Sequence, residues 1–153
     1  MSSEGVEYCF EFQRRVEFHE TDLAGIVHFS NFYRYMETAE HAFLRSLGHS
    51  IHEQLGEAEI GWPRVNATCD FRKPARNDDI LTIRVSIEEI RTRAVRYGFH
   101  FYIDVDEPPI AIGSIVAVCV KFEDGGIVAV PIPDQIRSDL EAARKRAATD
   151  SPS

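Results

Sequence analysis

The chain has 153 residues and a mass of 17.4 kDa, a size typical of one domain. Hydrophobic residues make up 44% and charged residues 27% of it, which argues against a disordered, collagen-like or disulfide-knotted chain. The net charge of −8 disfavours nucleic-acid binding, because that affinity comes mainly from neutralised phosphates. The longest apolar run, 110–120, is too short for a bilayer, and the polar N-terminal segment does not resemble a signal peptide. We therefore expect a soluble cytoplasmic enzyme or binding protein without nucleic-acid or membrane partners.

The hydrophobic period changes once in the first third of the chain. Apolar and polar residues alternate from Val6 to Phe18, which predicts a strand with one buried face. From Asn31 to Leu47, apolar residues recur every three or four positions, as in an amphipathic helix. Ser30 or Asn31 can cap the start of this helix, and Gly48 can end it.

The remaining chain is dominated by predicted strands. A polar connection, Ser50 to Gly61, leads into four apolar segments separated by turn-forming residues, namely 65–71, 81–87, 95–105 and 110–122. The last segment is almost continuously apolar, which predicts a central strand covered on both faces. The chain then ends in a short predicted helix with Pro133 in its first turn, and in a frayed tail at 149–153. The whole chain, 1–153, is expected to form one domain of the α+β class with a mainly antiparallel sheet.

The loop between the first strand and the helix holds the densest group of reactive side chains. His19, Glu20, Asp22 and His28 stand within ten residues, directly before the predicted helix N-terminus. Such a terminus offers unpaired N–H groups and a partial positive charge, which can hold a carboxylate ionised or stabilise a developing oxyanion. On spacing alone, these acids can equally be ordinary solvated loop residues.

Two pairs of residues have a spacing that could serve a metal ion. They are Glu37 with His41, and His19 with Asp22. Glu37 and His41 lie toward the polar side of the helix, where such a pair is usually a solvated contact. No Cys or His cluster has the spacing of a zinc site. The sequence therefore predicts neither a metal nor a redox cofactor.

The segment VEFHETDLAGIVHFSNFYRYMETAE resembles the signature of the 4-hydroxybenzoyl-CoA thioesterase-like family of acyl-CoA thioesterases. The matching features are Thr21-Asp22, Gly25, the pair Ile26-Val27, and a helix with Phe32, Tyr35, Glu37 and Ala39. Weaker matches follow at Gly61-Trp62-Pro63, 70–74, Asp79 and 131–133. The resemblance implies the hotdog fold, in which a curved antiparallel sheet wraps around one long central helix, here followed by a short C-terminal helix.

The family resemblance also implies an activity, the hydrolysis of an acyl- or aroyl-CoA thioester to the free acid and CoA. Asp22 would be the nucleophile or general base, and the backbone N–H of Gly61, near the start of a helix turn, would polarise the thioester carbonyl. His28, Tyr33, Trp62 and Glu37 would be pocket or support residues. His28 precedes Phe29, whereas many relatives have an aromatic residue before the His, so a structural role for His28 stays open.

Two further expectations concern what the protein binds. Arg72, Lys73 and Arg76 form a basic cluster that could bind CoA phosphates, although a solvated turn explains them equally. A second cluster, Arg91, Arg93 and Arg96, is as ambiguous. The resemblance implies a homodimer with sites at the subunit interface, often assembled further into a homotetramer, a dimer of dimers.

Other functions fit the same residues. A hotdog hydratase or dehydratase would need an acid–base pair, for which His28 with Glu37 or Glu40 is the candidate. Another branch of hotdog thioesterases uses a Glu on the long helix, which again points to Glu37 and Glu40. A non-catalytic acyl-CoA-binding module would keep the pocket without needing Asp22. The acyl group, and a carrier-protein thioester in place of CoA, are left open.

Overall fold

The computed structural model describes residues 7–150, with side chains up to 147. Val6, at the start of the first predicted strand, lies outside the described residues. The elements in chain order are β1 (Phe10–Arg15), η1 (Phe18–Glu20), α1 (Ser30–Ser46), β2 (His52–Leu55), β3 (Ala58–Gly61), β4 (Arg64–Phe71), β5 (Ile80–Ile90), β6 (Ala94–Tyr102), β7 (Ala111–Val118), β8 (Val120–Glu123), β9 (Gly126–Ala129) and α2 (Asp134–Asp150).

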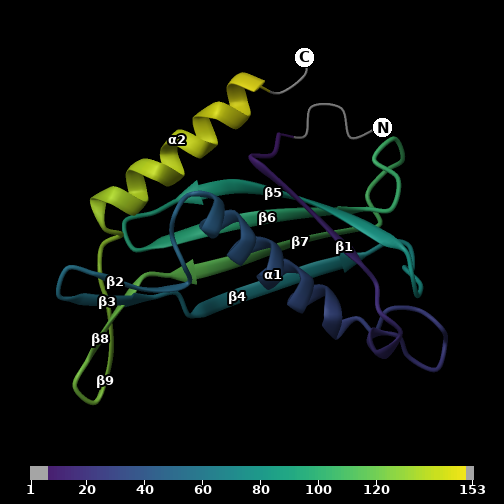
Figure 1. Cartoon of the computed structure of the whole chain (residues 1–153), viewed down its shortest axis with the longest axis horizontal. Helices are drawn as coiled ribbons and strands as arrows, with labels where there is room; N and C mark the ends of the chain where they lie inside the picture. Colours follow the sequence, from purple (N-terminus) through teal and green to yellow (C-terminus); the bar gives the residue numbers. More distant parts are fainter. Residues whose placement is uncertain (1–6, 151–153) are drawn as a thin grey trace.

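The strands form two antiparallel sheets. Five strands pair in the order β1-β5-β6-β7-β4, and four shorter ones in the order β2-β3-β8-β9. Helix α1 lies across one face of the larger sheet, and α2 packs beside β5 (Figure 1). The α+β class and the mainly antiparallel sheet are confirmed. Among the described residues, neither helix is long and apolar enough to cross a membrane.

Helix α1 buries the stripe that its sequence predicts. Phe32, Met36, Ala39 and Phe43 are each at most 4% exposed. At the C-terminal end, Gly48 adopts a φ of +85°, and its N–H donates to the carbonyl of Arg45. The N–H of His49 donates to the carbonyl of Leu44, which completes a Schellman motif and confirms Gly48 as the terminator.

The predicted cap at the start of α1 is wrong. The N-cap residue is Phe29, and no side chain caps the helix there. The hydroxyl of Ser30 instead lies 2.8 Å from Nδ1 of His28, and the side-chain amide of Asn31 donates to the carbonyl of Glu20 at 2.8 Å. Both polar side chains therefore tie the helix to the preceding loop.

The polar connection predicted over 50–61 is wrong, because this segment forms the β2–β3 hairpin. Leu55 pairs with Ala58, and Gly56 turns the chain with a φ of +60°. The strands of the hairpin carry few apolar residues, and much of the hairpin is exposed or half-buried. The alternation that identifies a half-buried strand is therefore weak here.

The apolar run 110–122 is not one central strand. It divides at Cys119 into β7 and β8, which belong to different sheets, and the central strand of the larger sheet is β6. The N–H of Cys119 donates to the carbonyl of Arg93, and its carbonyl accepts from the N–H of Val130. Ala117 and Val120, on either side of this break, are both buried, and so hydrophobicity alone does not reveal it.

Both ends of the chain also differ from expectation. Phe18 belongs to η1 and is 77% exposed, so the first strand ends earlier than its alternation suggests. Helix α2 has 17 residues and is not short; it buries Ile136, Leu140 and Ala143. Within the predicted frayed tail, the backbone of 149–150 is helical and 151–153 lie outside the described residues.

Strand β4 is the one strand of the larger sheet whose predicted buried face is open in a single chain. It forms an edge of the sheet next to β7. Val65 is 63% exposed and Phe71 is 46% exposed, although both belong to the apolar set of this strand. An uncovered edge strand with apolar side chains is a surface suited to pairing with another chain.

Candidate active site

A short hydrogen-bonded loop presents Asp22. The backbone N–H of Asp22 donates to the carbonyl of Ile26, and the N–H of Gly25 donates to the carbonyl of Asp22, both at 2.9 Å. Thr21 and Val27 close the loop as an isolated antiparallel bridge. Gly25 has a φ of +79°, a conformation that glycine adopts without strain. The loop thus holds Asp22 immediately before α1.

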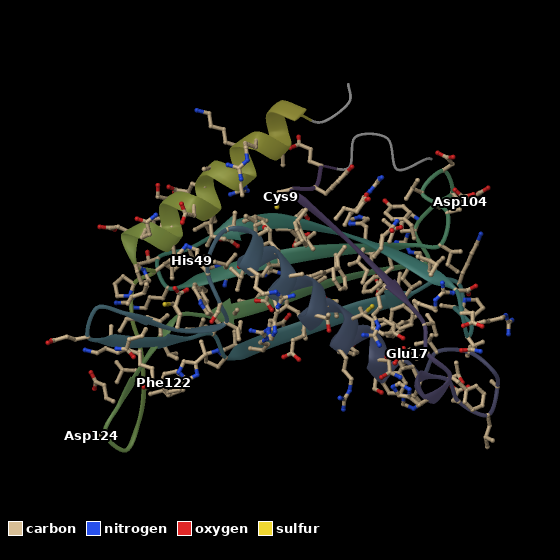
Figure 2. All side chains as sticks on the ribbon, in the orientation of Figure 1. Cys9, Glu17, His49, Asp104, Phe122 and Asp124 are labelled. Carbon is tan, nitrogen blue, oxygen red and sulfur yellow. The ribbon has the colours of Figure 1, made fainter. Side chains whose placement is uncertain are left out.

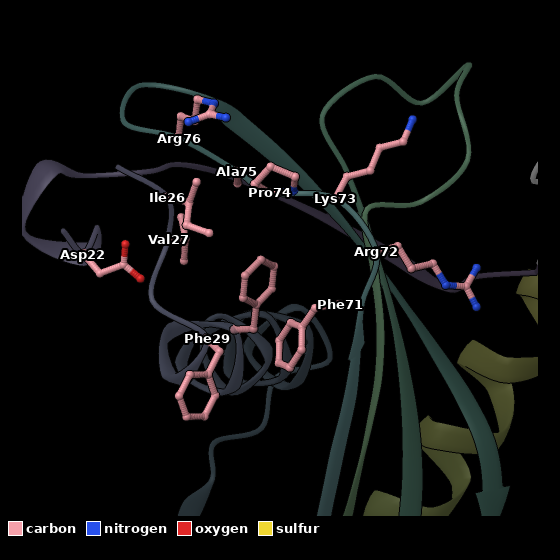
Figure 3. A pocket seen from close by; sticks show the side chains of 11 residues that line it. Asp22, Ile26, Val27, Phe29, Phe71, Arg72, Lys73, Pro74, Ala75 and Arg76 are labelled. Atoms are coloured by element: carbon pink, nitrogen blue, oxygen red, sulfur yellow. The ribbon is translucent and has the colours of Figure 1, made fainter. Parts of the chain in front are cut away.

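Asp22 lines a cavity of about 630 Å³ between this loop, the start of α1 and the segment after β4. Figure 3 shows its carboxylate directed toward the cavity. The wall is apolar and aromatic. Phe71 contacts Phe32 edge-on, with ring centroids 5.3 Å apart, and Phe29 in the same way at 6.3 Å. The cavity therefore combines one carboxylate with a largely apolar lining.

The basic cluster that the sequence singles out lies at this cavity. Arg72, Lys73 and Arg76 all line it and are exposed, so the fold brings them together with Asp22. Their side chains extend outward from the rim (Figure 3). Exposed cations at the rim of an apolar cavity can attract a phosphorylated ligand while its apolar part lies inside.

The N-terminus of α1 lies at the same cavity. Phe29 lines the cavity and is the N-cap residue of the helix. Its backbone N–H has no acceptor among the residues that the structure describes. The N–H groups and partial positive charge of a helix N-terminus can stabilise a negative oxygen. Asp22 and a potential oxyanion site thus occur together within one chain.

Three of the predicted support residues lie outside this cavity. His28 is exposed, and its ring faces the hydroxyl of Ser30. Tyr33 and Glu37 line a second groove of about 370 Å³ between α1 and β4, where a carboxylate oxygen of Glu37 lies 3.8 Å from Arg64. In a single chain, Asp22 therefore lies in one groove and the predicted support residues Tyr33 and Glu37 lie in another.

Gly61 ends β3 and Trp62 follows it, just before β4 begins, whereas the cavity adjoins the end of β4. Gly61 is a strand residue of β3 and pairs with His52 and Val120, so its predicted place at a helix turn is wrong. A Cβ at this position would lie 2.6 Å from the ring of Phe122, which explains why a glycine fits there. Trp62 is buried at 5% exposure. One chain does not bring either residue to Asp22.

Glu40, the other candidate helix acid, has no exposed surface. Its carboxylate pairs with Arg64, whose other terminal nitrogen donates to the carbonyl of Trp62 at 2.6 Å. Burial raises the pKa of Glu40 to about 7, although the Arg64 cation opposes the shift. A substrate cannot reach Glu40 without a rearrangement, which disfavours the helix-Glu and hydratase alternatives that require it.

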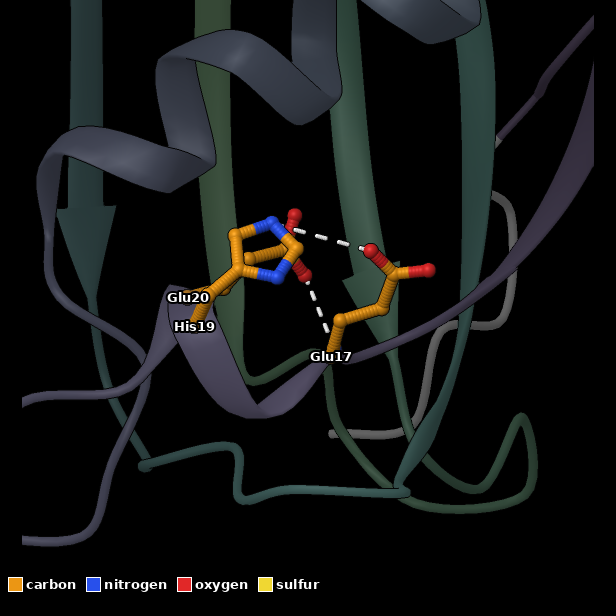
Figure 4. A group of neighbouring side chains, drawn as sticks. All are labelled: Glu17, His19 and Glu20. Atoms are coloured by element: carbon orange, nitrogen blue, oxygen red, sulfur yellow. Dashed lines mark hydrogen bonds and ion pairs between the residues drawn. The ribbon is translucent and has the colours of Figure 1, made fainter.

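Two acids and a histidine before the loop, Glu17, Glu20 and His19, form a compact cluster (Figure 4). Nε2 of His19 lies 3.6 Å from the carboxylate of Glu17. The carboxylate of Glu20 already accepts hydrogen bonds from the N–H of Glu17 and the hydroxyl of Tyr35, each at 2.9 Å, and pairs with Arg14. Glu20 thus belongs to a hydrogen-bond and ion-pair network within the protein. Sequence spacing did not predict its contact with Tyr35.

The antiparallel sheet with a helix across one face is the architecture of the hotdog-fold thioesterases among solved structures. The chain belongs to the thioesterase-like superfamily, whose family model matches residues 16–140. The resemblance inferred from the sequence and the hotdog fold are therefore confirmed.

Three known proteins illustrate the similarity. A 1,4-dihydroxy-2-naphthoyl-CoA hydrolase of Thermosynechococcus vestitus is 26% identical over 137 residues, covering 90% of this chain and 92% of that protein. The 4-hydroxybenzoyl-CoA thioesterase of a Pseudomonas species is 33% identical over 84 residues, 54% of this chain and 60% of that protein. The solved structure of a gentisyl-coenzyme A thioesterase has a TM-score of 0.74 and 34% identity. The match covers 86% of this chain and 99% of that chain. The protein is an enzyme of the thioesterase class.

Proposed function

We propose that the protein hydrolyses the CoA thioester of an aromatic acid, with Asp22 as the nucleophile or general base. The observation that carries this proposal is the placement of the Asp22 carboxylate at a cavity walled by Phe29, Phe32 and Phe71. Aromatic side chains favour edge-to-face or offset contacts with another planar ring. The aroyl-CoA substrates in the names of the similar proteins support the same substrate class.

The reaction needs a base or nucleophile and a site for negative charge. The carboxylate of Asp22 either attacks the thioester carbonyl to form a mixed anhydride, which water then cleaves, or removes a proton from an attacking water. In both routes the carbonyl oxygen becomes negative, and the free N–H of Phe29 is the donor that this chain offers nearby. CoA leaves as the thiolate, which takes up the proton held by Asp22 in the general-base route and a proton from solvent in the nucleophilic route. Neither route requires a metal or redox cofactor.

A second copy of the chain would complete the site. When two β4 edges pair antiparallel around a twofold axis, the beginning of one β4 lies beside the end of the other. This pairing would carry Gly61 and Trp62 of one copy toward the other copy's Asp22 cavity. It would also cover the exposed Val65 and Phe71. We therefore propose a homodimer with two shared sites, which can associate further as a dimer of dimers. The N–H of Gly61 stays a predicted donor in that assembly.

The CoA part of the substrate would lie at the rim of the Asp22 cavity. The phosphates of CoA would be bound by Arg72, Lys73 and Arg76, which place exposed positive charge along one side of the rim. We place the enzyme in the cytoplasm, where acyl-CoA esters are made and where the free thiols of its three cysteines stay reduced.

The decisive experiment measures free-thiol release from aromatic and aliphatic acyl-CoAs by the wild type and Asp22→Asn. We expect aromatic esters to be the better substrates and the variant to lose about a hundredfold or more in kcat, in the range that an acid–base or nucleophilic group contributes. Asp104→Asn is a matched control. Asp104 also accepts a hydrogen bond from a backbone N–H two residues on, at the same 2.9 Å as Asp22, but in the β6–β7 connection.

The outcomes separate the remaining functions. Equal turnover by wild type and Asp22→Asn would refute the role of Asp22. Binding of CoA esters without turnover by the wild type would favour a non-catalytic binding module. A preference for aliphatic esters would leave the reaction in place and overturn the aromatic substrate class.

A further inference from the structure

Glu20 is a buried acid next to the reactive loop. The residue is 7% exposed, and both carboxylate oxygens are engaged. One oxygen accepts hydrogen bonds from the hydroxyl of Tyr35 in α1 and from the N–H of Glu17, each at 2.9 Å. The other pairs with Arg14 of β1, whose guanidinium also lies 4.9 Å from the centre of the Tyr35 ring. One side chain thus joins β1, η1 and α1.

The backbone of Glu20 makes two further connections. Its carbonyl accepts from the N–H of His28 and from the side-chain amide of Asn31, at 2.9 and 2.8 Å. His28 ends the loop that holds Asp22, and Asn31 lies in the first turn of α1. Both ends of the loop and the helix N-terminus are therefore fixed to the same residue.

Only Thr21 separates Glu20 from Asp22, and Phe29 follows His28 directly. A shift of Glu20 would therefore change the position of the Asp22 carboxylate relative to the free N–H of Phe29. We infer that Glu20, held by Arg14 and Tyr35, is a positioning residue that sets the geometry between these two groups. The inference rests on the proposed function of Asp22. Displacing a reacting group by about 1 Å can cost about a hundredfold in rate.

The test begins with Glu20→Gln, which keeps the length of the side chain but turns an N–H donor toward the guanidinium of Arg14. We expect kcat to fall about ten- to a hundredfold while KM stays within about twofold, because the altered group does not touch the substrate. Adding Arg14→Gln should restore much of kcat, because two amides can pair where a donor faced a donor. A residue needed only for stability would not show this recovery.

Two further variants check that the effect is specific to the contacts of Glu20. Tyr35→Phe removes one hydrogen bond to Glu20 without changing the shape of the core, and should lower kcat in the same direction by a smaller factor. Glu53→Gln is the matched control, since Glu53 is also a shielded acid paired with a cation-forming side chain, but in β2. Its kcat should equal that of the wild type.

Amide hydrogen exchange supplies a measurement that is independent of turnover. Exchange over residues 18–32 should accelerate in Glu20→Gln and return toward the wild-type rate in the double variant. The proposal is overturned if Glu20→Gln keeps the wild-type kcat, or if both kcat and exchange are insensitive to adding Arg14→Gln. If the wild type cleaves no thioester, the proposed function fails, while the exchange result still decides whether Glu20 fixes the loop.

Discussion

His49 joins three elements at the C-terminal end of α1. Its Nε2 lies 2.7 Å from a carboxylate oxygen of Asp139 in α2, and its Nδ1 lies 3.1 Å from one of Glu53 in β2. Figure 2 shows the residue between α2 and the β2–β3 hairpin. Burial lowers the pKa of His49, but the two hydrogen-bonded carboxylates outweigh it, so the pKa is raised above its usual value. The imidazolium therefore stabilises the docking of α2.

Replacing His49 by Gln removes this cation and cannot satisfy both acids. A hydrogen bond to a charged group contributes about 1.5–3 kcal/mol. The side chain of Asp139 is 32% exposed and keeps a contact with Gln135 at 3.2 Å, so it regains solvation, whereas Glu53 is more shielded. We expect a total loss of about 3 kcal/mol in the free energy of unfolding at pH 6. This corresponds to a decrease in Tm of about 6–12 °C for a chain of this size.

The sign of the pH dependence follows from the raised pKa. The stabilisation is fully present below the unfolded-state pKa of His, about 6.5, and is lost as the pH rises through the folded-state pKa. Urea unfolding of wild type and His49→Gln from pH 5 to 9 should therefore show a difference that shrinks at alkaline pH. His52→Gln is the control, because His52 pairs with Glu59 at the surface and should cost no more than about 1 kcal/mol. A difference that is constant across this range would refute a charged His49.

Two further predictions concern the proposed dimer and the CoA subsite. Val65→Asp, on the open face of β4, should weaken dimerisation, measured by light scattering, because it disrupts apolar contacts. Ile127 in β9 is similarly exposed, and Ile127→Asp should leave dimerisation unchanged. Equal behaviour of the two variants would contradict the β4 interface. Replacing Arg72, Lys73 and Arg76 together by Gln should raise KM for CoA esters about tenfold and reduce its salt dependence, with a smaller effect on kcat; an unchanged KM in steady-state assays would place the phosphates elsewhere.

Hydrophobic periodicity predicted the elements that bury a face within one chain. Helix α1, β5 and β6 follow their patterns because the core of a single chain covers them. The β2–β3 hairpin escaped prediction because its largely accessible strands leave little apolar alternation. Strand β4 shows the reverse case. Its apolar alternation predicted a buried face, but in one chain these side chains are largely exposed.

The candidate site was predictable where a local motif carries the chemistry. Asp22 was identified from the loop motif and its resemblance to a family, and the fold places it with the basic cluster at 72–76. The contact between Glu20 and Tyr35 depends on how far the loop lies from the face of α1, a distance that tertiary packing decides. The proposed roles of Gly61 and Trp62 would require a second chain, and the hydrophobic period of one chain gives no information on such a partner.

Cys119 imposes a requirement on length as well as on composition. On β7 most buried side chains stand at odd positions, namely Ala111, Ile115 and Ala117, with Val116 also buried, whereas β8 buries Val120 at an even one. The single residue between them changes the phase of the alternation as the chain passes from one sheet to the other. Deleting it would exchange the inner and outer faces of β8 while removing only one small buried side chain from the segment. Position 119 therefore accepts a different small side chain more readily than an insertion or a deletion.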